Sequence, residues 1–209
     1  VFSLEMSREQ LISRMLSADA LIQGSQLRTG NLSVDEWTKV AVSAQNIARM
    51  PMYIDDSAGI TVAEMKAKLR RVPNLGLVVI DYLQLMSSGR RIDNRVQEVS
   101  EITRNLKVMA KELDVPIITL SQLSRSPDKR TGDHRPVLSD LRESGSIEQD
   151  ADLVMFLYRD EYYNDDSEDK GVAEVIVAKN RHGATDTVKL AFDGQHTRFL
   201  SRELFRDAP

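Results

Sequence analysis

The stretch Gly76–Met86 constrains the possible fold most strongly. An uninterrupted apolar run, Leu77 to Ile80, leads directly into one carboxylate, Asp81. A short run rich in Val and Ile is typical of a strand buried on both faces, as in a parallel sheet. Asp81 would then stand at the carboxyl end of that strand, where open α/β sheets bind their ligands. A carboxylate there suits a Mg²⁺-bound water shell beside phosphates, and it equally suits a cap for a turn or for the next helix.

Three capping boxes predict where the early helices begin, because a Ser or Thr is followed three residues later by Glu or Gln. They are Ser7 with Gln10, Ser33 with Glu36, and Thr61 with Glu64. We expect a first strand over 1–4 and a polar break over 24–31. The helix that begins at the Ser33 box should reach about residue 50 and be followed by a short strand over 52–54. The helix that begins at the Thr61 box should end near residue 72.

The second half predicts one long helix, further strands and then a change of period. Val96, Val99, Ile102, Leu106, Met109 and Leu113 mark the buried stripe of the long helix. Residues 116–120 are expected as a buried strand and 153–158 as a further apolar strand. Residues 124–135 are expected as a mobile, polar and basic loop, and 160–169 as an acidic loop. Residues 172–178, 187–192 and 197–200 alternate, which predicts an antiparallel meander closing the sheet. The fold class expected is α/β, a sandwich with a mostly parallel central sheet and an antiparallel carboxyl-terminal meander.

Composition excludes several classes of protein. The 209 residues suit one domain, and no apolar run approaches the ~18–20 residues that span a bilayer, so no membrane association is expected. There is no cysteine, which excludes disulfides and thiolate metal sites and is compatible with the cytoplasm. The net charge of −4 means that any binding of nucleic acid must use local basic loops. The three histidines stand singly, without metal-ligand spacing.

Five motifs, taken in order, suggest a family. They are residues 3–7 (SLEMS), 79–84 (VIDYLQ), 120–125 (LSQLSR), 139–152 (SDLRESGSIEQDAD) and 178–183 (AKNRHG). Together they resemble the carboxyl-terminal motor domain of bacterial replicative hexameric DNA helicases of the DnaB type, over nearly the whole chain. The resemblance implies a RecA-like three-layer sandwich that uses ATP and Mg²⁺. It also implies translocation on single-stranded DNA with duplex unwinding, a hexameric ring of identical chains, and a primase and a helicase loader as partners.

The resemblance also predicts a phosphate-binding loop that these residues lack. That family's ATPase begins with G-x-x-x-x-G-K-[ST], whose backbone N–H groups and Lys hold the phosphates. No such stretch occurs in the sequence. By the family's layout the loop would precede Val1, so residues 1–209 are expected to be a motor domain without its first strand, phosphate loop and first helix.

The resemblance assigns roles to three side chains at expected strand ends. Glu5 would be the general base that orients the attacking water, and otherwise it is a surface acid before a capped helix. Asp81 would hold Mg²⁺ through water. Gln122 would contact the γ-phosphate and report the nucleotide state, and otherwise it is an amide that binds loop backbone.

The same resemblance assigns three basic residues to the nucleotide. Lys179 and Arg181 are two apart on an expected strand and would share a face. In the family such a pair reaches the neighbouring subunit's site, where the Arg stabilises charge on the transferring phosphoryl group. The alternative is an exposed basic strand that pairs with the acidic loop 160–169. Arg14, on the first helix, would also reach the nucleotide, or else it lies on a solvated face.

Residues Arg142, Glu143 and Gly145 resemble the family's central-channel loop. Gly145 would permit close approach of a phosphate backbone and Arg142 would supply charge, which suits sequence-independent gripping of one DNA strand. The alternative is an ion network with Asp140 that braces a turn. Ser88–Arg91 is a second candidate channel loop.

Two other functions are compatible with the same sequence. A recombinase-like strand-pairing ATPase would use the same sheet in a helical filament rather than a ring. A docking or assembly module for a loader or primase would hydrolyse nothing. Tight binding of Mg·ATP would exclude the docking module.

Overall fold

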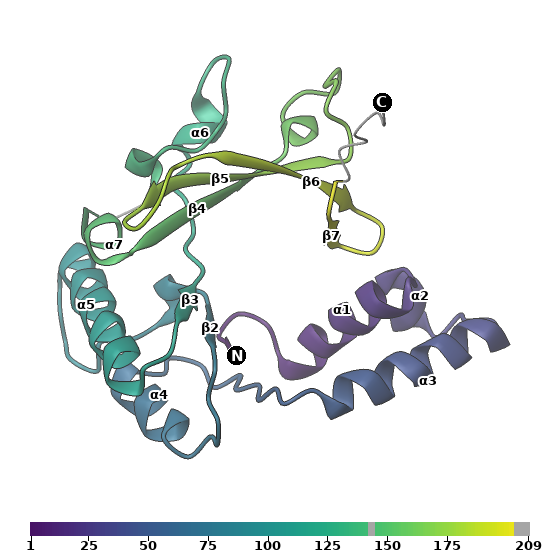
Figure 1. Ribbon diagram of the computed structural model, residues 1–209, viewed down its shortest axis with the longest axis horizontal. Helices are drawn as coiled ribbons and strands as arrows, with labels where there is room; N and C mark the ends of the chain where they lie inside the picture. Colours follow the sequence, from purple (N-terminus) through teal and green to yellow (C-terminus); the bar gives the residue numbers. More distant parts are fainter. Residues whose placement is uncertain (142–144, 203–209) are drawn as a thin grey trace. The chain divides into compact units, whose positions relative to one another are not determined.

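Strand β2 (Val78–Asp81) is the middle strand of a three-stranded parallel sheet in the computed structural model, which describes residues 1–141 and 145–202. β1 (Phe2–Ser3) pairs with one side of β2, and β3 (Ile117–Thr119) pairs with the other (Figure 1). The parallel sheet expected around the apolar run is therefore confirmed.

The chain divides into two compact units. The first contains Val1–Leu11, Pro51–Lys129 and Val137–Asp152, and the second contains Ile12–Met50, Arg130–Pro136 and the chain from Leu153 onward. The parallel sheet belongs to the first unit.

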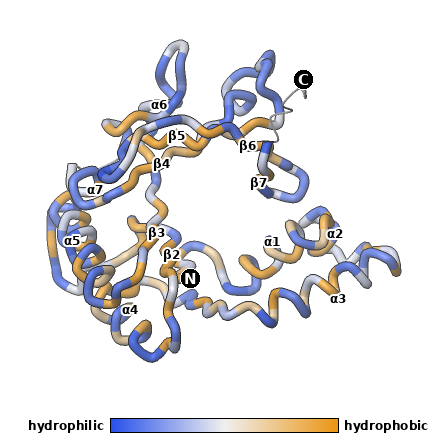
Figure 2. The backbone as a smooth tube through the Cα atoms, viewed as in Figure 1, coloured by the Kyte–Doolittle hydropathy of each residue, from blue (hydrophilic) through white to orange (hydrophobic). Residues whose placement is uncertain are grey.

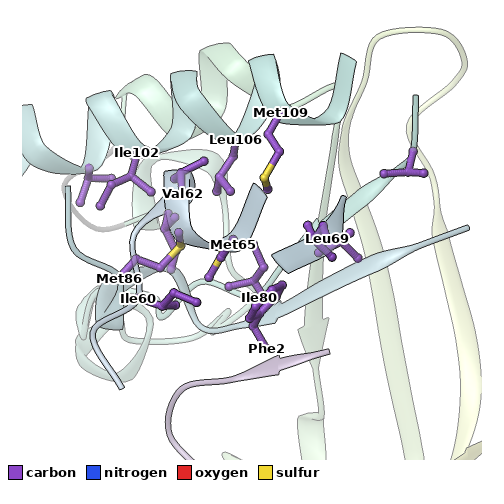
Figure 3. Close-up of a cluster of buried hydrophobic side chains, with 14 residues drawn as sticks. Phe2, Ile60, Val62, Met65, Leu69, Ile80, Met86, Ile102, Leu106 and Met109 are labelled. Carbon is purple, nitrogen blue, oxygen red and sulfur yellow. The ribbon is translucent and has the colours of Figure 1, made fainter. Parts of the chain in front are cut away.

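The core of the first unit covers one face of the parallel sheet. Burial alternates along β2, because Val78 and Ile80 are almost fully buried while Val79 and Asp81 are half-buried. Side chains of α4 (Val62–Leu69) and α5 (Arg95–Leu113) pack on the buried face (Figure 3). Burial of β2 on both faces was therefore a wrong prediction, since α4 and α5 cover only the Val78 and Ile80 side within this unit.

The helices of this unit follow the predicted caps closely. In α4 the Thr61 and Glu64 capping box is present, and the helix ends earlier than expected. In α5 the predicted stripe is buried except at Val96, which is 47% exposed, and Leu113, which is half-buried. The remaining helical elements are the short helices η1 (Leu83–Leu85), α6 (Ser126–Lys129), η2 (Leu138–Asp140) and α7 (Gly145–Asp150). β3 is half-exposed rather than buried, and α6 lies in a stretch predicted as loop.

Helix α1 (Arg8–Ala20) begins in the first unit and continues into the second, followed by α2 (Gly24–Thr29) and α3 (Val34–Arg49). The Ser7 and Ser33 capping boxes are both formed. The polar break predicted over 24–31 is wrong. Its residues form α2, which ends at Gly30 because that glycine adopts φ 70°, a left-handed conformation that closes helices.

The second unit contains a separate four-stranded antiparallel sheet. Its strands β4 (Leu153–Tyr158), β5 (Val172–Asn180), β6 (Thr187–Asp193) and β7 (Arg198–Leu200) pair in chain order, with η3 (Asp160–Tyr162) between β4 and β5. The predicted meander is confirmed, but it forms its own sheet. β4 alternates between buried and exposed residues, so its apolar run (Figure 2) is buried on one face only.

An ion pair holds the segment Arg130–Pro136 onto this antiparallel sheet. The Arg135 guanidinium donates twice to Glu174 of β5, at 2.7 and 2.8 Å, and stacks over the Tyr158 ring. Glu174 is only 4% exposed, and its hydrogen bonds raise the pKa of Arg135 above its usual value. The loop expected to be mobile is therefore anchored at this point.

The predicted strand over 52–54 is absent, and only an isolated bridge joins Asp55 to Phe2.

The Asp55 carboxylate offers a test of one electrostatic contact. Burial tends to raise the pKa of Asp55, but hydrogen bonds from Lys68 and Ser57 outweigh it and lower the pKa from 3.8 to about 2. Because the folded-state pKa is lowered, the resulting stabilisation is present above pH 3.8 and is lost as the pH falls towards 2.

We expect Asp55→Asn to lower the free energy of unfolding at pH 7 by about 1 kcal/mol, because solvent screens this partly exposed pair. The difference from wild type should shrink between pH 4 and pH 2. Urea unfolding across that pH range measures both, with Asp19→Asn, an exposed acid on α1, as the control. A loss of unfolding free energy that is the same at every pH would contradict the lowered pKa of Asp55.

Candidate active site

Three polar side chains leave the same edge of the parallel sheet. Ser3 is in register with Asp81, and Ile80 is in register with Thr119. Glu5 follows β1 by two residues, Asp81 ends β2, and Gln122 follows β3 by three residues. Since all three strands are parallel, their carboxyl ends lie together, so the structure places these three residues at one edge.

Glu5 lies in a turn that is fixed on both sides. The Leu4 N–H donates to the Asp81 carbonyl oxygen at 2.7 Å, which extends the β1–β2 pairing to the residue before Glu5. The buried Ser3 hydroxyl donates to the Met6 carbonyl oxygen at 2.7 Å and closes the turn. The Glu5 side chain is exposed beyond this turn.

Asp81 is half-buried and lies on one face of β2. Ile80 lies on the other face and is fully buried in the core. The core therefore fixes the strand beneath the carboxylate. The peptide bond from Asp81 to Tyr82 is cis.

The structure adds Gln84, which lies within one of the five motifs but had no role assigned to it. Its side-chain amide Nε2 donates to Ser121 Oγ at 3.0 Å and to the Gln122 carbonyl oxygen at 3.3 Å. Its Oε1 accepts from the Gln122 N–H at 3.2 Å. Both main-chain groups of Gln122 are thus bound by one side chain, while the Gln122 side chain is exposed. No sequence pattern marks a contact between residues 38 apart.

The basic pair belongs to the second unit, and one of its positions was predicted wrongly. Lys179 lies in β5, opposite Val154 of β4. Arg181 lies in the turn after Asn180, where β5 ends, so the two do not share a strand face. Arg181 is exposed and Lys179 is half-buried. In the acidic loop, Asp169 pairs with Lys189 of β6 at 2.6 Å.

The remaining candidates are placed as follows. Arg14 is exposed on α1, in the second unit. Arg142 and Glu143 lie outside the described residues. Gly145 begins α7 and is exposed, and a Cβ added at this glycine would meet no described atom within 4 Å.

The second candidate channel loop was Ser88–Arg91, and its first three residues, Ser88 to Arg90, line an open pocket of about 550 Å³ together with the start of α4 and one face of α5. Gly89 adopts φ 74°, which favours glycine, and a Cβ there would come within 3.1 Å of Thr61. Arg90 and Arg91 are 79% and 97% exposed in their side chains.

The acidic and imidazole side chains of the described residues form no group of three that could hold a metal. His134 stacks on Tyr163, and His196 contacts Asp193 at 2.7 Å. A single carboxylate such as Asp81 nevertheless fits Mg²⁺, which keeps several waters and takes phosphate oxygens as its other ligands. In the described part of the chain no helix is long and apolar enough to cross a bilayer.

The two carboxylates and the amide lie at the carboxyl ends of parallel strands, which is where open α/β proteins bind their ligands, nucleotides among them. The chain belongs to the DnaB-like helicase C terminal domain family, whose sequence model matches residues 1–201. This membership favours a helicase motor over a recombinase or a docking module.

Curated relatives agree with this family. The chain is 53% identical over 207 residues to the replicative DNA helicase DnaB of Geobacillus stearothermophilus. It is 52% identical over 207 residues to the replicative DNA helicase DnaC of Bacillus subtilis. In both cases the match covers 97% of this chain and 45% of the relative, so the chain spans less than half of their length.

Solved structures agree as well. A chain solved as an ATPase domain superposes with a TM-score of 0.93 at 41% identity, covering 97% of this chain and 73% of that chain. A DnaB-like replicative helicase, solved for its interactions with primase, gives 0.92 at 41% identity and covers 97% and 51%.

Proposed function

We propose that these residues form the ATP-hydrolysing motor of a replicative DNA helicase, which moves along single-stranded DNA and separates duplex. The observation that carries the proposal is the convergence of Glu5, Asp81 and Gln122 at one sheet edge, in a chain of the helicase family. We take residues 1–209 as one RecA-like motor domain, acting in the cytoplasm, where DNA replicates in bacteria.

The three edge residues divide the chemistry of phosphoryl transfer. The Glu5 carboxylate accepts a proton from the attacking water and orients it towards the γ-phosphate. The Gln122 amide donates to a γ-phosphate oxygen and senses its departure. Asp81 would hold Mg²⁺ through water, and the metal would neutralise charge on the β- and γ-phosphate oxygens.

The basic pair acts in trans in this proposal. Lys179 and Arg181 of one protomer reach the nucleotide bound by the next, within a ring of six identical chains. Arg181 stabilises charge on the transferring phosphoryl group, so hydrolysis requires an assembled ring. The position of Arg181 in an exposed turn supports a reach beyond its own sheet. Arg14 would add a further nucleotide contact.

For DNA, we propose that Arg142, Glu143 and Gly145 grip the phosphate backbone of one strand in the ring's channel. Such contacts carry no base specificity and weaken with salt. A primase and a helicase loader are proposed as protein partners, the first supported by the primase interactions of the similar DnaB-like helicase.

The role of Asp81 tests the proposal directly. In the full natural protein, Asp81→Asn should lower single-stranded-DNA-stimulated ATP hydrolysis roughly 10- to 100-fold at limiting Mg²⁺, because it weakens a water-mediated metal ligand. Part of the loss should be recovered at high Mg²⁺. Steady-state hydrolysis across a Mg²⁺ titration measures this, with Asp114→Asn at the end of α5 as the control.

Wild-type protein that neither binds nor hydrolyses Mg·ATP would overturn the enzyme proposal. An Asp81→Asn loss that is the same at every Mg²⁺ concentration would remove Asp81 from the metal site.

A further inference from the structure

The main-chain pairing between β2 and β3 stops before it reaches Gln122. The Leu120 N–H donates to the Ile80 carbonyl oxygen, and the Leu83 N–H donates to the Leu120 carbonyl oxygen, both at 2.9 Å. From Leu83 onward the chain forms η1, so its main chain no longer runs beside the segment that follows β3. Gln122 therefore lies beyond the reach of the β2 main chain.

The side chain of Gln84 supplies the hydrogen bonds that the β2 main chain no longer makes. Its primary amide donates to the Gln122 carbonyl oxygen and accepts from the Gln122 N–H, as a peptide group in a paired strand would. Main-chain donors and acceptors need partners, so this amide fixes the Gln122 backbone in one place. The third contact, to Ser121 Oγ, sets the plane of the amide.

The main chain of Gln84 is itself held by the first turn of α5. Arg95 Nη2 donates to the Gln84 carbonyl oxygen at 2.8 Å, and Arg95 also pairs with Glu98. Glu98 accepts the Ser88 N–H at 3.3 Å, so α5 holds both η1 and the segment that follows it. Burial tends to raise the pKa of Glu98, but hydrogen bonds from Arg95 and Ser88 outweigh it and lower the pKa, which keeps the acid ionised.

We propose that Gln84 is a positioning residue for Gln122, fixing its main chain so that its exposed side chain stands at the carboxyl edge beside Asp81. This inference rests on the proposed contact of Gln122 with the γ-phosphate. Gln84 acts through Gln122 rather than on the nucleotide or the metal. It connects the loop after Asp81 to the loop after β3, so that the two move together.

Gln84→Met tests the inference in the full natural protein, because methionine keeps the length of the side chain and removes its hydrogen bonds. We expect kcat for DNA-stimulated ATP hydrolysis to fall roughly 10- to 100-fold, since a displacement of about 1 Å in a catalytic group costs this much. KM for ATP should change much less than kcat, because the other proposed nucleotide contacts are retained. Gln97→Met, at an exposed position of α5, is the matched control.

A double mutant separates positioning from a merely structural role. If Gln84 acts through Gln122, Gln84→Met combined with Gln122→Ala should be no worse than Gln122→Ala alone. Ser121→Ala, which removes only the third contact, should cost less than Gln84→Met. Gln84→Glu, which cannot donate to the Gln122 carbonyl oxygen, provides a second variant if Gln84→Met does not fold.

The outcomes distinguish the two proposals. Wild-type kcat in Gln84→Met beside a defective Gln122→Ala overturns this inference alone, and so do losses that multiply in the double mutant. Wild-type kcat in Gln122→Ala overturns the role of Gln122 and the inference with it.

Discussion

Glu5→Gln is expected to lower kcat for ATP hydrolysis by about 10²- to 10⁴-fold in the full natural protein, because an amide of the same shape cannot accept a proton from water. ATP binding should be nearly unchanged, since the role proposed for Glu5 is to act on the water and not on the bound nucleotide. Steady-state hydrolysis with single-stranded DNA and equilibrium binding of a fluorescent ATP analogue measure the two effects. Unwinding should be lost together with hydrolysis.

The control for this change is Glu9→Gln, an exposed acid in the first turn of α1. It should leave kcat within about twofold, the scale of surface substitutions. Hydrolysis at the wild-type rate in Glu5→Gln would assign the general base to another residue and leave Glu5 as an acid in a capped turn.

In the role proposed for Arg181, Arg181→Ala is expected to have the largest effect, a loss of about 10³- to 10⁵-fold in kcat, the size found for arginine fingers. In barrier height this is roughly 4–7 kcal/mol. The reason is that the guanidinium stabilises charge that develops only in the transition state, so ATP binding should change little. Arg49→Ala, an exposed arginine at the end of α3, is the control.

Mixing two inactive proteins decides whether Arg181 acts in trans. When Glu5→Gln and Arg181→Ala subunits assemble together, some interfaces combine an intact Glu5 from one with an intact Arg181 from the other. Hydrolysis should therefore reappear in the mixture. If Arg181 served the site of its own chain, every site would lack one group and the mixture would stay inactive.

Local chemistry made much of the fold predictable from the sequence. The boxes at Ser7, Ser33 and Thr61 each join residues three apart, and all three form as predicted. The antiparallel strands were marked by alternation over 172–178, 187–192 and 197–200. Helix α2 was missed because six residues, most of them polar or glycine, carry too little apolar periodicity to separate a short helix from a loop.

The candidate site was predictable in its residues more than in its arrangement. The motifs drew attention to Glu5, Asp81 and Gln122 because polar side chains follow apolar runs. Arg181 was assigned to a strand because spacing alone does not show where a strand ends. Gln84 was given no role because Asp81 was already the functional residue of its motif. Its hydrogen-bond partner Gln122 lies 38 residues away in the sequence.

The sequence by itself determined the capped starts of α1, α3 and α4, the buried stripe of α5 and the alternating strands of the meander, since these depend on contacts within a few residues. Only the tertiary structure decided that the parallel strands align their carboxyl ends, that α4 and α5 cover just one face of β2, and that the meander forms its own sheet. Each of these depends on pairing between distant segments, whose register and partners local pattern does not specify.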